Sequence, residues 1–270
     1  FKEAIMFEIL QYSFFQHALI AALLATISCG IIGTYITHRN MIFISGGITH
    51  ASFGGIGMGY FFGINPIISA AVFSILSSIG IEYISEKIKV TRDSMIGMFW
   101  SFGMAIGIIF IALSEGYTPN LLTFLFGNIL TVSKFDIYLM VGVNLIIILT
   151  FLLLYKEILF LSFDETFIKT RRIPTKFLNY FLISLVALTI VINIKIVGII
   201  LVISFLTIPQ SIASLFVKKY SSIMFFSIGV GFTGALIGLF ASYFLNLPSG
   251  ASIIVSFILI FLISKIFIII

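Results

Sequence analysis

The segment SGGITHASFGGIGMGYFFG, residues 45–63, sets a single histidine in a stretch that is otherwise mostly apolar and rich in glycine. Small residues recur in it at every fourth position, and in a helix they form one row: Gly47, Ala51, Gly55, Gly59 and Gly63. A row of this kind lets the backbone of a second helix come close, as is typical of helices packed inside a membrane. The segment therefore predicts a membrane-embedded helix in close contact with its neighbours.

His50 lies beside this row, with Gly46 and Gly54 one turn away on either side. An ionisable ring in an apolar helix usually faces a helix interface or a polar cavity rather than lipid. Two interpretations are open at this point. Either His50 only hydrogen-bonds a neighbouring helix, or it contacts a solute that crosses the membrane.

The composition of the whole chain agrees with a membrane location. Of its 270 residues, 60% are hydrophobic and 9% are charged, and the mean hydropathy is +1.25. In a soluble domain about a quarter of all residues are usually charged, so a soluble protein is excluded. We expect an all-α, polytopic transmembrane bundle that forms a single domain over residues 1–270. The Lys and Arg residues are spread between the apolar runs, which does not favour nucleic-acid binding.

The apolar runs are separated by charges and by Gly, Pro and Asn, and a helix needs about 20 residues to cross the hydrocarbon core. They predict spans near residues 12–36, 42–63, 66–85, 94–113, 135–155, 177–193, 196–216, 222–245 and 250–269. The segment 121–133 is too short to cross alone, and Pro209 should kink the seventh run. The predicted number of spans is therefore eight or nine.

The placement of Lys and Arg predicts the orientation in the membrane. If the loops 38–40, 86–93, 156–176 and 217–221 share one side with the C-terminus, only Lys2, Lys134 and Lys195 of the 15 Lys and Arg residues remain on the other side. Cytoplasmic loops carry an excess of these residues. The four loops are therefore expected in the cytoplasm.

The longest polar loop is KEILFLSFDETFIKTRRIPTK, residues 156–176. Its aromatic residues alternate with charges at helical intervals, which is typical of a short amphipathic helix on the inner face of a membrane. The residues expected to act in it are Asp164, Glu165, Phe167, Lys169, Arg171 and Arg172. Such a helix either lies on anionic lipid or docks a cytoplasmic partner.

No catalytic motif occurs in the sequence. GxxxxGK[ST], GxSxG, HExxH and zinc-type Cys/His clusters are absent, so the chain does not hydrolyse ATP through a phosphate loop. The acidic residues all fall at or near predicted span ends, which weakens the case for a carrier with buried carboxylates.

His38 is expected to be solvated and His17 to be structural. A lone imidazole is a good ligand for zinc and an acceptable one for manganese or iron.

Three stretches resemble the membrane permease subunit of bacterial ABC importers for divalent metals, the ABC-3 family. RNMIFISGGITHASFGGIGMGYFFGINP (39–66) is similar to a family segment that contains a GDxxxHA pattern and ends at asparagine-proline. VGIILVISFLTIPQSIA (197–213) resembles a glycine-rich family helix, and LPSGASIIVSFILIFLIS (247–264) resembles the last span. DSMIG (93–97) and LFGN (125–128) fit weaker family patterns. The resemblance covers nearly the whole chain in order.

The resemblance implies a type II ABC importer permease fold and a place in the bacterial inner membrane, where the chain moves Zn²⁺, Mn²⁺ or Fe²⁺ into the cytoplasm. The chain is then a transporter subunit and not an enzyme. The implied partners are two cytoplasmic ATP-binding subunits, an extracytoplasmic metal-binding protein, a second permease copy in a homodimer, and membrane lipid. No permanently bound cofactor is expected, because the metal is the transported substrate. The loop at 156–176 matches the position of the ATPase-coupling helix.

In the family pattern an aspartate and a histidine four residues apart contact the metal in the second span. The histidine matches His50, whereas the aspartate position is Gly46 here. Without the carboxylate the site loses a hard oxygen ligand, so zinc or iron is expected to fit it better than tightly bound manganese. Ser45, Thr49 and Ser52, or backbone carbonyls near the glycines, are candidate neutral ligands.

Two other functions remain open. A permease for a metal chelate, such as a siderophore or cobalamin, would need a wider cavity and usually a longer chain. A cation channel or carrier would work without an ATPase. The sequence also leaves open which metal is carried and what replaces the aspartate at Gly46.

Overall fold

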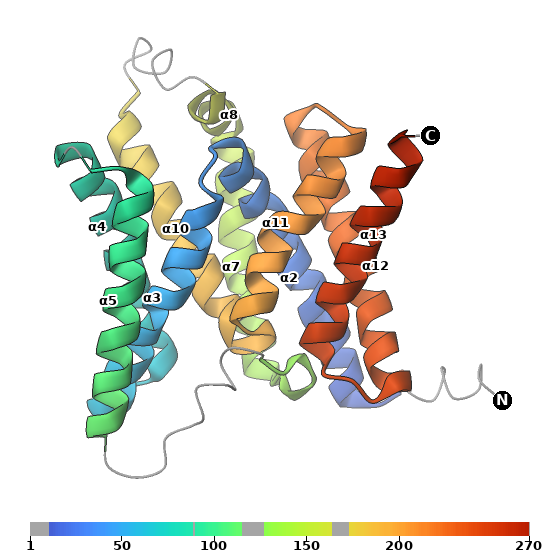
Figure 1. Ribbon diagram of the computed structural model, residues 1–270, viewed down its shortest axis with the longest axis horizontal. Coiled ribbons are helices and arrows are strands. Elements are labelled where there is room, and N and C mark those ends of the chain that lie inside the picture. The colour runs from blue at the N-terminus through green and yellow to red at the C-terminus, as the bar shows by residue number, and fades with distance from the viewer. Residues whose placement is uncertain (1–10, 89, 115–126, 164–172, 270) are drawn as a thin grey trace. The chain divides into compact units, whose positions relative to one another are not determined.

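The computed structural model describes residues 11–88, 90–114, 127–163 and 173–269, apart from the side chain of residue 269. Every regular element in these ranges is a helix, which confirms the predicted all-α bundle (Figure 1). The elements are α2 (Ser13–His38), α3 (Ile42–Phe61), α4 (Pro66–Lys87), α5 (Arg92–Leu113), the short 3₁₀ helix η1 (Ile129–Thr131), α7 (Lys134–Leu153), α8 (Tyr155–Phe163), α10 (Thr175–Val197), α11 (Ile199–Phe216), α12 (Tyr220–Leu245) and α13 (Ser249–Ile269).

Each of the predicted spans corresponds to one helix, and the ends of each helix lie within about four residues of the predicted ends, the usual uncertainty of such boundaries. In the described ranges, 8 helices are long and apolar enough to cross a membrane. Helix α3, which contains the glycine-rich segment, is not among them. The predicted number of eight or nine spans is confirmed. The described part of segment 121–133 holds only η1 and adds no span.

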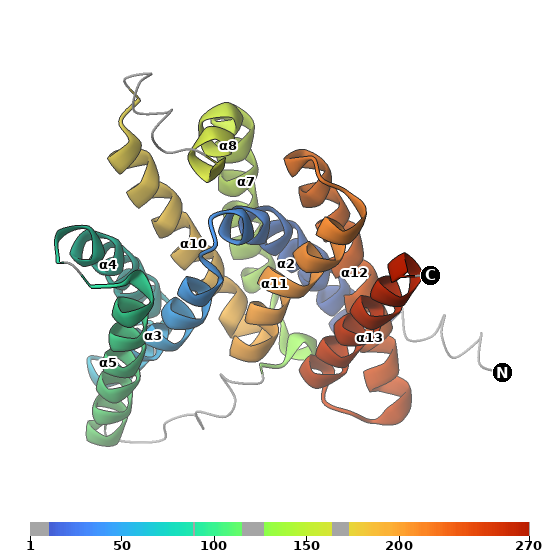
Figure 2. The same ribbon diagram turned by 45° about the horizontal axis from the view of Figure 1, so that its top comes forward.

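The helices form two compact units. Unit 1 comprises residues 1–34, 122–148 and 196–270, and unit 2 comprises residues 35–121 and 149–195. Within unit 1, α11, α12 and α13 pack against one another (Figure 2). Within unit 2, α3 packs against both α4 and α5. Unit 2 therefore contains the glycine-rich segment 45–63 with His50.

Pro209 lies inside α11 and does not end it. Proline has no backbone N–H, so the Phe205 carbonyl one turn earlier loses its usual donor. The side chain of Gln210 replaces that donor: its Nε2 donates to Phe205 O at 3.1 Å and to Cys29 O of α2 at 2.8 Å. A carbonyl without a partner is costly in apolar surroundings. Gln210 therefore lets proline lie within α11 and also ties α11 to α2 inside unit 1; the kink expected at Pro209 stays a prediction.

Candidate metal centre

Helix α3 is enclosed by protein, because most of its 20 residues are buried. Its row of small residues is where the neighbouring helices come close. A Cβ on Gly47 would collide with Ile96 of α5, and Cβ atoms on Gly55 and Gly59 would collide with the backbone of α4. The close packing that the spacing predicts is confirmed, and it involves two neighbours rather than one.

A second close contact joins the backbones of α3 and α5 at Gly57 and Gly107. A Cβ on Gly57 would lie 2.8 Å from Gly107 Cα and nearer still to its carbonyl oxygen. We expect Gly57→Val to lower the free energy of unfolding by about 3 kcal/mol, because packed helices accept added volume only by moving apart. Thermal unfolding of the purified chain in detergent measures this loss.

The control for this prediction is Gly97→Ala in α5, the helix against which Gly57 packs, because a Cβ at Gly97 meets no described atom within 4 Å. This variant should unfold at the same temperature as the unaltered chain or slightly above it, since alanine favours a helix over glycine by about 1 kcal/mol. Equal unfolding temperatures for the two variants would show that the backbone contact of α3 with α5 does not stabilise the fold.

The close approach of α3 and α5 places His50 against Trp100. The two rings stack with their centroids 4.1 Å apart and their planes 7° apart. Stacking covers a face of the imidazole, whereas its nitrogen atoms bond in the plane of the ring. His50 is part-buried, and its Nδ1 is buried with no hydrogen-bond partner among the described residues. The ring therefore has one face against an aromatic surface and a nitrogen atom that no described residue uses.

Gly46 lies one turn before His50 and leaves room beside it. The nearest heavy atom to an ideal Cβ at Gly46 would be Cζ3 of Trp100 at 3.7 Å, which is an ordinary van der Waals distance. Across the part of the chain that the structure describes, no three His, Cys, Asp or Glu side chains gather into a metal-binding group. Among the described residues, the candidate site thus consists of one imidazole with an open position next to it, and that it holds a cation stays a prediction.

The three hydroxyl residues expected as neutral ligands are fully buried and are bonded to their own helix. Ser45 donates to Ile42 O at 2.6 Å, and Ser52 donates to Thr49 O at 2.6 Å. Thr49 donates to Ser45 O. Because these protons are used within α3, only the oxygen lone pairs remain for a cation. That these residues act as ligands stays a prediction.

Helix α8 forms the first part of the loop predicted at 156–176. Ile158 and Leu161 on it are buried, and Phe163 is exposed. A helix is therefore confirmed for this part of the loop, and its amphipathic character stays a prediction. The expected coupling residues lie outside the described residues: Asp164, Glu165, Phe167, Lys169, Arg171 and Arg172.

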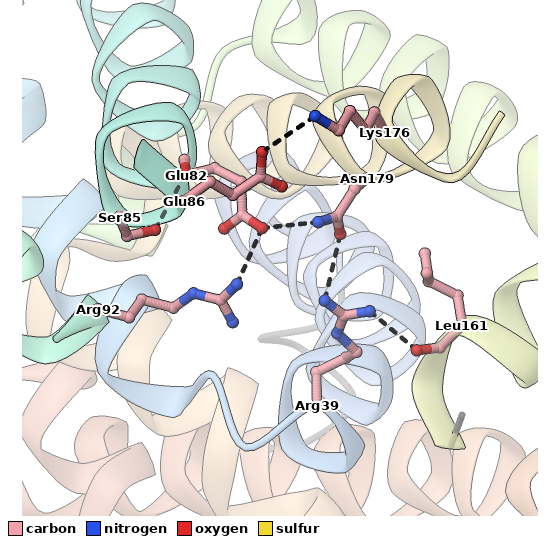
Figure 3. A network of polar contacts seen from close by, with 8 residues as sticks. All are labelled: Arg39, Glu82, Ser85, Glu86, Arg92, Leu161, Lys176 and Asn179. Atoms are coloured by element: carbon pink, nitrogen blue, oxygen red, sulfur yellow. Dashed lines mark hydrogen bonds and ion pairs between the residues drawn. The ribbon is translucent and has the colours of Figure 1, made fainter. Parts of the chain in front are cut away.

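A polar cluster at one end of unit 2 connects three of the loops that the charge count placed on one side (Figure 3). Arg39 contacts Leu161 and Asn179, and Arg92 contacts Glu82, whose side chain also bonds Asn179. These contacts confirm that segments 38–40, 86–93 and 156–176 share a side. The compartment on that side stays a prediction from the positive-inside rule.

Two features of this region were missed from the sequence. Trp100 is one of them: it is the only tryptophan in the chain and lies in the glycine-containing helix α5, eight residues after its start. The pairing of Glu82 with Arg92 was also missed, because charges near span ends were interpreted as loop residues. The one available signal for Glu82 was its place a full turn inside the apolar run that ends at Lys87.

Comparisons with known proteins agree with the fold. Residues 11–268 match the model of the ABC 3 transport family. The chain is 42% identical over 262 residues to a membrane protein of Synechocystis sp., covering 97% of this chain and 93% of that protein. It is 37% identical over 259 residues to the manganese transport system membrane protein MntC of Listeria monocytogenes, covering 96% of this chain and 92% of that protein. Among solved structures, PsaBC from Streptococcus pneumoniae in complex with Fab matches with a TM-score of 0.86 at 33% identity, over 98% of this chain and 95% of that one.

Proposed function

Because the chain belongs to the ABC 3 transport family, we propose that it is the multi-pass permease subunit of an ATP-driven importer that carries a divalent metal cation into the cytoplasm. The observation that carries this proposal is His50, whose buried Nδ1 has no partner among the described residues and whose ring stacks on Trp100. An imidazole nitrogen of this kind is a ligand for zinc, manganese and iron.

Two considerations bear on the metal. The relative from Listeria monocytogenes is named as a manganese transport protein, which supports Mn²⁺. The missing carboxylate at Gly46 favours a cation that binds well to imidazole alone, such as Zn²⁺. The number of cations taken up per ATP hydrolysed, measured for Mn²⁺ and for Zn²⁺, decides which of the two is the preferred substrate.

The remaining partners follow from the same proposal. ATP is hydrolysed by separate cytoplasmic subunits, which is supported by the absence of a phosphate loop from the sequence. The permease works as a homodimer and receives its metal from an extracytoplasmic binding protein.

The experiment reconstitutes the chain in lipid vesicles with its ATP-binding subunit and its metal-binding protein, and measures uptake of Mn²⁺ and Zn²⁺. We expect uptake only when ATP and the ATP-binding subunit are both present. Cation flux through the chain alone, without ATP, would show a channel or carrier instead. Uptake of a ferric siderophore or cobalamin, with no uptake of free metal, would show a permease for chelates.

The docking role of the loop at 156–176 has its own test. Arg171→Glu together with Arg172→Glu should lower ATP-driven metal uptake by about tenfold or more, because like charges brought together at an interface cost several kcal/mol. Membrane insertion should be intact. Lys218→Glu with Lys219→Glu is the control, since it reverses the same charge in another loop predicted on the same side. Equal uptake by the two double variants would contradict docking at the first loop.

A further inference from the structure

Unit 2 contains a buried polar cluster that the proposed metal site does not use. The Glu82 cluster consists of the side chains of Arg39, Glu82, Arg92 and Asn179 and the carbonyl of Leu161 (Figure 3). Glu82 is 1% exposed and Asn179 is 5% exposed. Burying a carboxylate is strongly unfavourable unless charged and hydrogen-bonding partners meet it. The side-chain hydrogen bonds of Glu82 all fall on its Oε1, from Arg92 and Asn179, whereas its Oε2 is buried with no hydrogen bond to a described residue. These two contacts are therefore the ones that offset the burial of the carboxylate.

The contacts of the Glu82 cluster form one continuous chain. Oε1 of Glu82 accepts from Nη2 of Arg92 at 2.9 Å and from Nδ2 of Asn179 at 2.6 Å. The Oδ1 of Asn179 accepts from Nη2 of Arg39 at 3.3 Å. The other terminal nitrogen of Arg39, Nη1, donates to Leu161 O at 2.8 Å. Arg39 thus donates to α8 through Nη1 and to α10 through Nη2.

These two hydrogen bonds of Arg39 end on the helices that precede and follow the predicted coupling residues in the sequence. Leu161 lies two positions before the end of α8 at Phe163, and Asn179 lies about one turn after the start of α10 at Thr175. Segment 164–172 connects these two helices in the sequence. A partner that displaced α8 or α10 would therefore act on Arg39, which donates to both helices.

Two members of the Glu82 cluster, Arg39 and Arg92, lie at or just before the starts of the helices that carry the stacked rings. Arg39 directly precedes the turn into α3, and Arg92 is the first residue of α5. His50 lies eight residues after the start of α3, and Trp100 lies eight residues after the start of α5, which is about 12 Å along each helix. The Glu82 cluster therefore holds the starts of the two helices that carry the two stacked rings.

The link from Arg39 to α3 is short, and its backbone N–H groups are hydrogen-bonded. Asn40 adopts a left-handed conformation with φ of 53°, and its N–H donates to Thr37 O at 3.1 Å. The next residue, Met41, donates to Ile36 O at 2.9 Å and accepts from Ile44 N at 3.0 Å. Because this turn has its backbone bonded on both sides, α3 is expected to follow a displacement of Arg39 rather than absorb it.

We propose that Arg39 is a positioning residue that transmits movement of α8 and α10 through the Glu82 cluster to α3 and α5, and thereby changes the stack of His50 on Trp100. This inference rests on the proposed function in one respect, the docking of ATP-binding subunits on this side of the chain. A lysine keeps the charge of Arg39 but cannot hold two acceptors in the fixed fork geometry of a guanidinium. Arg39→Lys therefore distinguishes an effect of the two simultaneous hydrogen bonds of the guanidinium from an effect of its positive charge alone.

The test measures the fluorescence of Trp100 in the complex of the permease with its ATP-binding subunits. The contribution of Trp100 is the difference between complexes with and without Trp100→Phe, since the chain has no other tryptophan. We expect ATP with vanadate to change this emission in the unaltered complex, and the change to be about tenfold smaller in the Arg39→Lys complex. Mn²⁺ transported per ATP hydrolysed should fall by a similar factor while ATP hydrolysis persists.

Lys176→Gln is the matched control. Lys176 also bridges α10 and α4, through Glu86 at 3.8 Å, but its side chain is 78% exposed. An exposed ion pair contributes little, so this variant should keep both the Trp100 response and the transport ratio. If the Glu82 cluster only stabilises the fold, Arg39→Lys will lower the unfolding temperature and leave the response of each folded complex unchanged, which overturns the proposal.

The Trp100 signal also separates this proposal from the proposed function. A complex that hydrolyses ATP and changes its Trp100 emission, but takes up no metal, would contradict metal import and leave transmission through Arg39 supported. A complex that imports metal with no ATP-dependent change at Trp100, or with the same change after Arg39→Lys, would overturn transmission and leave metal import supported.

Discussion

His50→Ala is expected to lower ATP-driven metal uptake by about 100-fold or more, because even a residue that only supports a metal ligand changes metal affinity or activity by about 10- to 100-fold. The variant removes the imidazole that stacks on Trp100 and whose Nδ1 no described residue binds. Uptake of Mn²⁺ and Zn²⁺ into vesicles containing the assembled importer measures the loss. Folding should be retained, because alanine is smaller and favours a helix.

His17→Gln is the matched histidine control. His17 lies in α2, and its Nδ1 is 3.3 Å from Val132 O, so the ring already has a partner within the protein. Glutamine can donate to the same carbonyl, and uptake should be unchanged. If His50→Ala behaves like His17→Gln, then His50 is a packing residue and the metal passes elsewhere.

Gly46→Asp is expected to shift the selectivity of uptake toward Mn²⁺ by about tenfold, because a carboxylate adds a hard oxygen ligand and a negative charge beside an imidazole. The position accepts a side chain, since the nearest atom to a Cβ is 3.7 Å away. The aspartate would stand one helical turn from His50, where both side chains lie on the same face. Competition between Mn²⁺ and Zn²⁺ during uptake measures the shift.

Gly46→Asn keeps the shape of this change without the charge, and it should leave the Mn²⁺ preference within about twofold of the unaltered chain, since an amide oxygen is a neutral ligand. An equal shift in both variants would show that the effect comes from the size of the side chain. No shift in either variant would mean that the cation does not approach Gly46.

The helices could be predicted from the sequence because the bilayer imposes their length. Each apolar run has to supply about 20 residues, and the breaks between runs contain charges, glycine or proline. The prediction was least accurate at the end of α10, where the apolar run was expected to stop at residue 193 and the helix continues to Val197. Gly198 ends it with φ of 82°, a conformation that glycine adopts readily.

The candidate site could be predicted only in part. Helical spacing placed His50 beside the glycine row, and the close contacts of α3 confirm that row. The partner of His50 could not be found in this way, because spacing within one helix says nothing about which residue of another helix faces it. Glu82 and Asn179 are 97 residues apart in the sequence, so their hydrogen bond leaves no local pattern. The ligand roles of Ser45, Thr49 and Ser52 stay predictions.

The glycines and the histidine of α3 bear on how the chain is assembled during synthesis. A nascent helix enters the lipid phase when its side chains favour hydrocarbon over water, and neither glycine nor an imidazole contributes to that preference. The surfaces that cover it belong to α4 and α5, which leave the ribosome after it. We therefore expect α3 to be retained at the insertion machinery until both later helices have emerged, so that the three enter the bilayer together.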